Sequence, residues 1–386
     1  MPHHNIVFHD LLKLVPWSTL EELVKRHGAD ADAREFKTKE HLIALLYGQL
    51  SGASSLREMV DGLESHADCL YHLGGKAVKR STLADANIAR PSAVFSGLLA
   101  ALIATAHRRL RQEMGGCIRL IDSTSIRLNK LSANWARFSA GVCGVKAHVV
   151  YDPAADCPTY VSVTTSRVND ITAAQDMPVE RGATYVFDLG YYDYAWWRSL
   201  HDAGCRIVTR FKSNTPLTVL SEQPVAAGTS ILSDRIGLLP KRQAKNRQNP
   251  FSDPVREIRV VIDSGKILRI FSNDLTASAQ EIADLYKRRW AIELFFRWVK
   301  QTLRIRKFFG ASENAIRIQI AVALTTFLLL RLAQQTIKCE ASPIGPLAFA
   351  RGVRANLMHR RRIDELQRPR RPSVVNPRQM EFAWAA

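Results

Sequence analysis

The chain has 386 residues and 46% hydrophobic content, enough for two or three units of domain size with a sizeable buried core. Its 54 Lys and Arg residues outnumber 36 Asp and Glu residues, which gives a formal net charge of +18. This charge indicates a polyanionic partner, of which nucleic acid is the first to consider; the alternative is a protein that is basic without such a partner. The six cysteines are scattered, without a Cys-x-x-Cys pair or zinc spacing, which argues against a zinc site and is typical of reduced cytosolic thiols.

The first part of the chain, up to about residue 115, is predicted to be helical. Its opening residues lack the basic start, long apolar run and cleavage site of a signal peptide, so secretion is not expected. Apolar periodicity without any strand pattern predicts helices near 20–27, 39–50, 54–63 and 91–111.

From residue 117 the pattern changes to apolar runs of strand length. Three successive strands are predicted in CIRLIDSTSIRL, VKAHVVYD and TYVSVTTS. A helix over 170–177, a strand in ATYVFD, a helix across Trp196 and Trp197, and a strand in RIVTRFK follow. Strands followed by alternating helix and strand indicate an α/β domain with a mixed sheet and helices on its faces.

Residues 214 to about 275 are predicted to form a β-rich insertion, with a basic loop at 240–248 and a hairpin that turns at 263–265. A long helix begins at Ser278, where Glu281 completes a capping-box pattern. A second apolar helix is predicted over 314–337. Its most apolar part, 318–330, is shorter than the roughly 20 residues that span a bilayer, so we expect a buried core helix. The C-terminus is rich in arginine.

The segment 286–303, YKRRWAIELFFRWVKQTL, has two stripes when it is laid out as one helix. One arc should face the core and contains Leu285, Ile292, Phe296, Val299 and Leu303. An adjoining arc, roughly 80° wide, contains Tyr286, Arg289, Glu293, Arg297 and Lys300. This arc is either a solvated face with i,i±4 ion pairs, or a carboxylate among phosphate-binding cations.

Four residues of this helix carry a family resemblance. Tyr286, Arg289, Glu293 and Lys300 match, spacing for spacing, the Y-(2)-R-(3)-E-(6)-K signature of bacterial insertion-sequence transposases of the insertion-sequence-4 type. LIDSTSI and VFDLGYYD resemble the segments that contain the first and second catalytic aspartates of that family. The G-x-K-x-H run that begins at Gly144 and the N-terminal segments LLYGQLSGASSLREM and KRSTLADAN are also similar, so the resemblance covers most of the chain.

The resemblance implies an RNase H-like catalytic domain, which is a mixed five-stranded sheet with helices, interrupted by a β-rich insertion before the glutamate. We therefore expect an all-α N-terminal domain over 1–115 that binds DNA, a catalytic domain over 116–310 with the insertion at about 214–275, and a C-terminal helix with an Arg-rich tail over 311–386. The family acts on paired DNA ends as a dimer, so a homodimer is expected. The apolar helix 314–337 is then either an interface or an intramolecular packing element. No membrane partner is expected, and the location should be cytoplasmic, at the bacterial nucleoid.

The resemblance makes Asp122, Asp188 and Glu293 the expected catalytic and metal-binding residues. Mg²⁺ or Mn²⁺ prefers carboxylate oxygens, and two such ions about 3.5 to 4 Å apart can activate an attacking oxygen and stabilise a leaving one. The expected reaction is cleavage at the inverted-repeat ends of an insertion sequence, followed by joining of the 3′-hydroxyl ends to target DNA. The alternatives are a metal-dependent nuclease that does not join DNA, and a domesticated DNA-binding protein with relic catalytic residues.

Further residues are candidates for contact with double-stranded DNA. Arg289 and Lys300 should hold backbone phosphates, and Trp290 either stacks on an unpaired base or is a core aromatic. The other candidates, from the helix arc and from strands near the expected site, are Tyr286, Arg297, Lys146, His148, Arg210 and Lys212. Asp152 and Asp193 are interpreted as turn or helix-cap residues.

Overall fold

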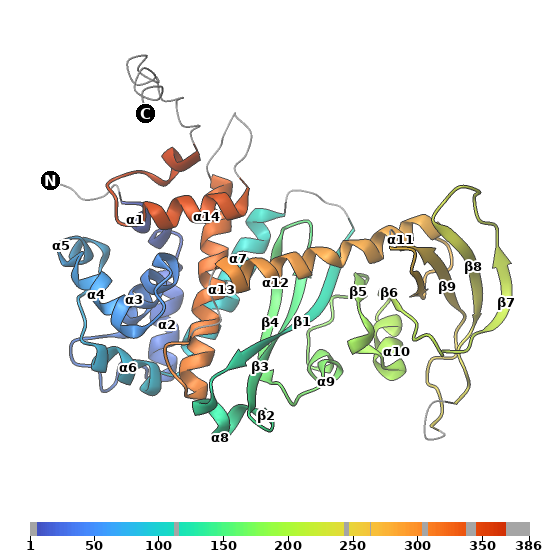
Figure 1. Ribbon diagram of the computed structural model, residues 1–386, viewed down its shortest axis with the longest axis horizontal. Coiled ribbons are helices and arrows are strands. Elements are labelled where there is room, and N and C mark those ends of the chain that lie inside the picture. Colours follow the sequence, from blue (N-terminus) through green and yellow to red (C-terminus); the bar gives the residue numbers. More distant parts are fainter. Residues whose placement is uncertain are drawn as a thin grey trace, which may run out of the picture.

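The computed structural model describes residues 6–111, 116–242, 247–262, 264–302, 308–336 and 345–367. Figure 1 shows a helical part at one end of the molecule, a sheet in the middle and further strands at the other end. The Arg-rich tail after residue 367, Leu303, Cys339 and the centre of the basic loop lie outside the described residues. The five described cysteines are free thiols, in line with the prediction.

The N-terminal region is helical, as predicted. Its helices are α1 (Val7–Leu12), α2 (Trp17–His27), α3 (Thr38–Ser51), α4 (Leu56–Glu64), α5 (Ala67–Leu70), the short 3₁₀ turn η1 (Tyr71–Leu73), α6 (Arg80–Ala89) and α7 (Ser92–Leu110). Ser55 caps α4 by accepting a hydrogen bond from the backbone N–H of Glu58 at 3.1 Å. Most residues of α3 are buried, so this helix forms the centre of the bundle.

Two C-terminal helices complete this bundle. The helix α13 (Glu313–Thr336) packs against α7 and α3, and α14 (Pro346–Ala355) packs against α3 and α13. A last 3₁₀ turn, η5 (Ile363–Gln367), packs against α14. The backbone N–H of Phe8 donates to the carbonyl of Leu357 at 3.0 Å. The helical part is therefore built from both ends of the described chain, an arrangement that local periodicity does not predict.

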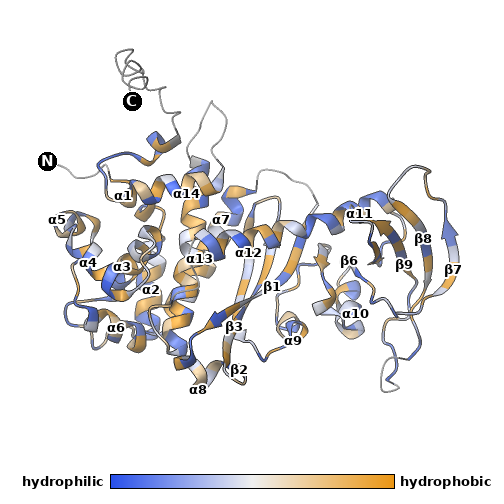
Figure 2. Ribbon diagram, viewed as in Figure 1, coloured by the Kyte–Doolittle hydropathy of each residue, from blue (hydrophilic) through white to orange (hydrophobic). Residues whose placement is uncertain are grey.

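The helix α13 is longer than its apolar centre suggested. By length and composition α7 and α13 could each cross a membrane, but 89% of the most apolar window of α13 is buried inside the protein. Figure 2 shows this helix coloured largely as hydrophobic where it runs between the N-terminal helices and the sheet. The prediction of a buried core helix is confirmed, although the argument from its short length was wrong.

The middle of the chain forms the predicted mixed sheet. Its elements are β1 (Ile118–Leu128), η2 (Lys130–Ser132), α8 (Ala133–Ala136), β2 (Arg137–Ser139), β3 (Val142–Asp152), β4 (Cys157–Thr165), α9 (Asp170–Gln175), β5 (Thr184–Phe187), η3 (Leu189–Tyr191), α10 (Tyr194–Asp202) and β6 (Arg206–Arg210). The central order is β4-β3-β1-β5-β6; β1 is antiparallel to β3 and parallel to β5, and β5 is parallel to β6.

The predicted β-rich insertion extends this sheet. Its strands are β7 (Thr218–Gln223), β8 (Ile231–Leu238), β9 (Val255–Val261) and β10 (Ile267–Ser272), and β9 and β10 form the predicted hairpin. Because β10 pairs antiparallel with β6, the sheet continues in the order β6-β10-β9-β8-β7. The insertion therefore shares backbone hydrogen bonds with the central strands, and the described residues form one ten-stranded sheet.

Helices cover both faces of the central strands. Alternate residues of a strand point to opposite faces, so Leu120 belongs to the core beneath α7, α13, α11 (Ala279–Arg288) and α12 (Trp290–Thr302). Ile121, its neighbour, belongs to the second core, which contains residues of α9 and α10. The central part of the sheet is thus the middle layer of a three-layer α/β/α arrangement.

The predicted long helix is interrupted at Arg289. It begins as predicted, because Ser278 Oγ accepts a hydrogen bond from the N–H of Glu281 at 3.1 Å. The second half of the capping box is wrong: the Glu281 carboxylate binds Arg206 Nη1 at 2.6 Å. Arg289 is the residue between α11 and α12. Its N–H donates a hydrogen bond to the carbonyl of Tyr286, and its carbonyl accepts one from the N–H of Ile292, so both bonds span three residues and not four.

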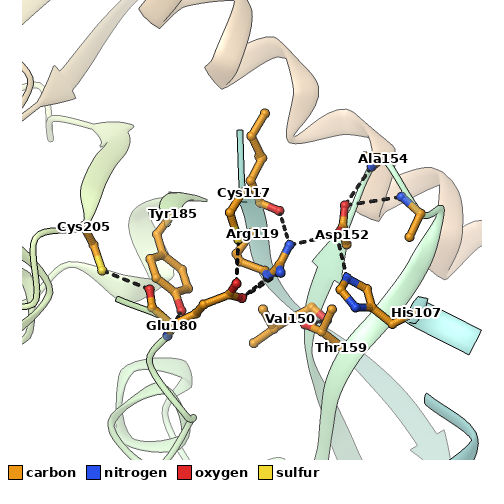
Figure 3. A network of polar contacts seen from close by, with 12 residues as sticks. His107, Cys117, Arg119, Val150, Asp152, Ala154, Thr159, Glu180, Tyr185 and Cys205 are labelled. Carbon is orange, nitrogen blue, oxygen red and sulfur yellow. Dashed lines mark hydrogen bonds and ion pairs between the residues drawn. The ribbon is translucent and has the colours of Figure 1, made fainter. Parts of the chain in front are cut away.

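A buried ion network joins α7 to β1 and β3. Figure 3 shows Arg119 between two carboxylates: its Nη1 donates to Asp152 Oδ2 at 2.8 Å and its Nε donates to Glu180 Oε2 at 2.9 Å. His107 of α7 reaches the same Asp152 oxygen at 2.8 Å. Asp152 also accepts from the N–H of Ala154 at 2.8 Å, which confirms its turn role. Because Asp152 is buried, its charge depends on these partners, and together they fix the beginning of β1.

Candidate active site

Two of the predicted carboxylates follow paired positions of adjacent parallel strands. The register of β1 and β5 ends at Ile121 and Phe187, and the next residues are Asp122 and Asp188. Asp188 Oδ1 accepts a hydrogen bond from the N–H of Gly190 at 2.8 Å, and this contact caps η3. β5 ends here whereas β1 continues to Leu128, so the pairing places Asp122 beside Asp188 at the edge of the sheet where β5 ends.

The helix α12 lies along β1 and forms one wall of a cleft of about 330 Å³. The cleft is lined by Asp122, Ser123 and Thr124 of β1 and by Glu293, Phe296, Arg297, Lys300 and Gln301 of α12. Four residues that the sequence singled out, namely Asp122, Glu293, Arg297 and Lys300, therefore meet in one place. The apolar side of α12 holds the helix there, because Ile292, Phe296 and Val299 are buried as predicted.

The Arg289 side chain lies between two of the carboxylates. Its Nη2 donates to Glu293 Oε1 at 2.6 Å, and its Nη1 is 3.7 Å from Asp122 Oδ2. Its guanidinium also lies 5.8 Å from the ring centroid of Tyr286. Tyr286 is buried rather than on an exposed arc. The predicted pairing of Glu293 with Arg289 is therefore present, and it is part of the cleft rather than of a solvated helix face.

Burial and neighbouring negative charges raise the pKa values of two groups near the cleft, Asp122 and Tyr191. Burial raises the pKa of Asp122 to about 6, and the charges of Asp188 and Glu293 contribute, while the Ser123 amide and Arg289 oppose the shift. Burial, followed by the charges of Asp122, Asp170 and Asp188, raises the pKa of the Tyr191 hydroxyl. Negative charge at this edge is thus incompletely balanced by the protein, an environment that favours a bound cation.

The donor chemistry fits a hard divalent cation, because the acidic side chains offer carboxylate oxygens. In the described part of the chain, however, no three His, Cys, Asp or Glu side chains are gathered closely enough to hold one ion. Glu293 is bound by Arg289 instead. Asp122 and Asp188 therefore fit a metal site, and Glu293 lies beside them with an arginine as its partner.

Two aligned residues of α12, Trp290 at its first position and Arg297 two turns later, are exposed. Trp290 is 50% exposed and lies under the guanidinium of Arg297, at 5.6 Å from the ring centroid. The expectation that Trp290 is a core aromatic is wrong, and its surface is accessible to a base.

The four residues predicted to contact DNA from strands near the site lie in different surroundings; they are Lys146, His148, Arg210 and Lys212. Lys146 Nζ donates to the Val168 carbonyl and to Asp170 Oδ1, each at 3.0 Å, whereas His148 has no exposed surface and its Nε2 lies 2.8 Å from Thr164 Oγ1. In this conformation His148 cannot reach DNA. Arg210 is half-buried at the end of β6, and Lys212 is exposed, with Nζ 4.3 Å from the ring centroid of Tyr192.

Asp170 and Ser123 are polar residues of this region that the sequence analysis missed. Asp170 begins α9, and an aspartate in the first turn of a helix is ordinary. Ser123 follows Asp122 in a strand. Neither position has a local sequence pattern that marks it: the pairing of β1 with β3 brings Ser123 close to Lys146, and the helix α9 brings Asp170 there. Asp193, in contrast, caps α10 as predicted, with Oδ1 2.8 Å from the N–H of Trp196.

The raised pKa of Asp122 has a consequence for stability. Because its folded pKa of about 6 exceeds the ordinary value of 3.8, ionisation of Asp122 destabilises the metal-free fold as the pH rises through this window. Asp122→Asn should therefore increase the free energy of unfolding by about 2 to 3 kcal/mol at pH 8, and the difference from wild type should shrink towards pH 4. Urea denaturation with a chelator measures it, with the exposed Asp176→Asn as control. A difference that is the same at both pH values would contradict the prediction.

Comparison with known proteins gives the family. Residues 113–329 match the family model of the transposase DDE domain, and residues 3–76 match a domain of unknown function, DUF4372. The chain is 39% identical over 313 residues to a Sinorhizobium fredii protein named as transposase y4zB, across 78% of this chain and 85% of that protein. It is 28% identical over 365 residues to a Geobacillus stearothermophilus protein named as a transposase for insertion sequence element IS5377, across 91% of each.

A solved structure of the piggyBac transposase synaptic complex with hairpin DNA is similar at a TM-score of 0.48 and 12% identity, over 96% of this chain and 83% of that one. The family model covers more than half of the chain, and the Sinorhizobium protein is similar over most of it. The chain belongs to the DDE transposase family, as its sequence resemblance predicted.

Proposed function

We propose that this transposase cuts DNA at the inverted-repeat ends of its own insertion sequence and joins the 3′-hydroxyl ends to target DNA, using two Mg²⁺ or Mn²⁺ ions. The observation that carries the proposal is the cleft between β1 and α12. It contains Asp122 and Glu293, lies at the edge that bears Asp188, and is lined by Arg297 and Lys300. Acidic ligands for a metal thus lie next to cations for phosphate.

The strand arrangement supports an RNase H-like core. The central strands have the order β4-β3-β1-β5-β6, with β1 antiparallel to β3 and parallel to β5. Asp122 lies on the first strand of this core, Asp188 follows β5, and Glu293 lies on a helix after the insertion. This is the order of catalytic residues that we expect for such a core.

The side chains can be assigned roles in this reaction. When bound, divalent cations supply activation of the attacking oxygen and stabilisation of the leaving oxygen. Asp122, Asp188 and Glu293 would be their ligands. Arg289 offers a planar fork that suits a phosphate as well as a carboxylate. A phosphate of DNA would therefore compete with Glu293 for the Arg289 guanidinium. Binding of Arg289 to the phosphate would make the Glu293 carboxylate available to a metal ion. Arg297 and Lys300 would hold the DNA backbone, and Trp290 would stack on an unpaired base.

Double-stranded DNA is the proposed partner of the whole chain. The net charge of +18 supports it, and we assign readout of the transposon ends to the N-terminal helices. The synaptic complex is proposed to be a homodimer in the bacterial cytoplasm, at the nucleoid. Because α13 is buried within one chain, its intramolecular packing is favoured over a role as the dimer interface.

The test uses the DNA that flanks the gene. Inverted repeats close to both ends of the reading frame are expected, and pre-cleaved versions of these ends should be joined to a target plasmid in Mg²⁺ or Mn²⁺. Cleavage without joined product would indicate a nuclease instead. Binding to the ends without cleavage or joining would indicate a domesticated DNA-binding protein.

A further inference from the structure

A cluster of polar side chains lies behind the catalytic strand, on the face of β1 opposite to α12. Asp170 Oδ1 accepts hydrogen bonds from Ser123 Oγ at 2.8 Å and from Lys146 Nζ at 3.0 Å. His148 Nδ1 is 3.8 Å from the same oxygen. The strand register explains the cluster, because Ser123 pairs with His148, and Lys146 is two residues away on the same face. The helix α9 brings Asp170 over these three side chains.

The cluster is connected to the first catalytic carboxylate through one residue. The Ser123 side chain binds Asp170, and the Ser123 backbone N–H donates to Asp122 Oδ1 at 2.8 Å. This contact fixes one Asp122 oxygen and leaves Oδ2 on the side of Arg289, 3.7 Å from its Nη1. The orientation of Asp122 towards the cleft therefore depends on where Ser123 is held.

Asp170 also lies against the loop that follows Asp188. A methyl group added at Gly190 would be 3.0 Å from Asp188 Oδ1 and 3.2 Å from Asp170 Oδ2. The Tyr191 hydroxyl lies within electrostatic reach of Asp122, Asp170 and Asp188 together. Asp170 is thus packed between the segments that bear the two catalytic aspartates.

A carboxylate in this position requires a compensating charge, because two further acidic groups are close. Lys146 provides it: its ammonium is held by Asp170 and by the Val168 carbonyl. His148 is buried, and burial lowers its pKa, which disfavours the charged form of its ring. The Gly144-x-Lys146-x-His148 run that the sequence analysis singled out for DNA contact therefore forms the support of Asp170.

We propose that Asp170 is a positioning residue of the metal site, which orients Asp122 through Ser123, and that Lys146 and His148 act by holding Asp170 rather than by contacting DNA. The inference rests on the proposed function, because it requires Asp122 to be a metal ligand. Partners that orient metal ligands typically change metal affinity or activity by about 10- to 100-fold when they are replaced, and Asp170 would act in this way indirectly, through the position of the Ser123 backbone N–H. An effect of that size separates the proposal from a purely structural role.

The experiment measures Mn²⁺ affinity directly, by titration calorimetry on the full chain, together with affinity for transposon ends and joining rate. Asp170→Asn and Ser123→Ala should each weaken Mn²⁺ binding by about 10- to 100-fold and leave end binding unchanged. If both act on one path, the double variant should be no weaker than Asp170→Asn alone. Ser123→Thr keeps the hydroxyl and should retain Mn²⁺ binding. Asp176→Asn, which removes an exposed carboxylate next to α9, is the matched control.

The Lys146→Gln variant separates positioning from DNA contact. The proposal predicts weaker Mn²⁺ binding with an unchanged salt dependence of end binding, whereas a phosphate contact predicts a salt slope smaller by about one. Wild-type Mn²⁺ affinity in Asp170→Asn, or effects that multiply in the double variant, would overturn the inference alone. If Asp170→Asn fails to fold, Ser123→Ala decides the question by the same readout. Absence of Mn²⁺ binding by the wild-type chain would overturn the proposed function together with the inference.

Discussion

Glu293→Gln is expected to abolish cleavage and strand joining while binding to transposon ends persists. The change keeps the shape of the side chain but removes the negative charge that a divalent cation requires, and it leaves Arg289 with a neutral acceptor in place of the carboxylate that it binds at 2.6 Å. The loss in rate should exceed the roughly 10- to 100-fold that follows when only a partner of a metal ligand is lost. Single-turnover cleavage of labelled ends, with end binding measured in parallel, gives the two quantities.

The matched control is Glu281→Gln, the same chemical change on α11. The Glu281 carboxylate is exposed and binds Arg206, and it does not line the cleft. Exposed ion pairs contribute only about 0 to 1 kcal/mol, so this variant should cleave at the wild-type rate. Unchanged cleavage in Glu293→Gln would remove Glu293 from the catalytic group, and loss of end binding in that variant would assign it a structural role.

Local periodicity predicts most of the elements in this chain. The helix predicted over 39–50 is found as Thr38–Ser51, and the strands that carry Asp122 and precede Asp188 lie where apolar runs end in a charged residue. The buried stripe of Ile292, Phe296 and Val299 was predicted because these residues share one unbroken helix. Each of these features depends on neighbours within a few residues, which is the range that a sequence pattern reports.

Features that depend on distant pairing could not be predicted in the same way. The predicted arc of Tyr286, Arg289 and Glu293 assumes one continuous helix, but the helix is interrupted at Arg289 and Tyr286 is buried. The pairing of β10 with β6 and the contact between Asp170 and Ser123 join segments that are far apart in sequence. No local pattern reports such contacts, and the closeness of Lys146 and His148 to Asp170 is visible only in the folded chain.

Affinity for DNA should fall steeply with salt, by roughly 10³- to 10⁵-fold between about 50 and 200 mM if six to ten phosphates are contacted. The physical reason is release of counterions from the DNA when the cations of this +18 chain replace them. Fluorescence anisotropy with end DNA, titrated at several KCl concentrations, gives the slope of log affinity against log salt.

Two arginine variants test whether the cleft contributes to the salt dependence of DNA binding. Arg297 lines the cleft, and Arg297→Gln should lower the slope by about one and weaken binding to all sequences alike. Arg288, an exposed arginine on α11, does not line the cleft, and Arg288→Gln should leave the slope as it is in the wild type. A slope in Arg297→Gln equal to that of the wild type would mean that the DNA backbone does not contact Arg297.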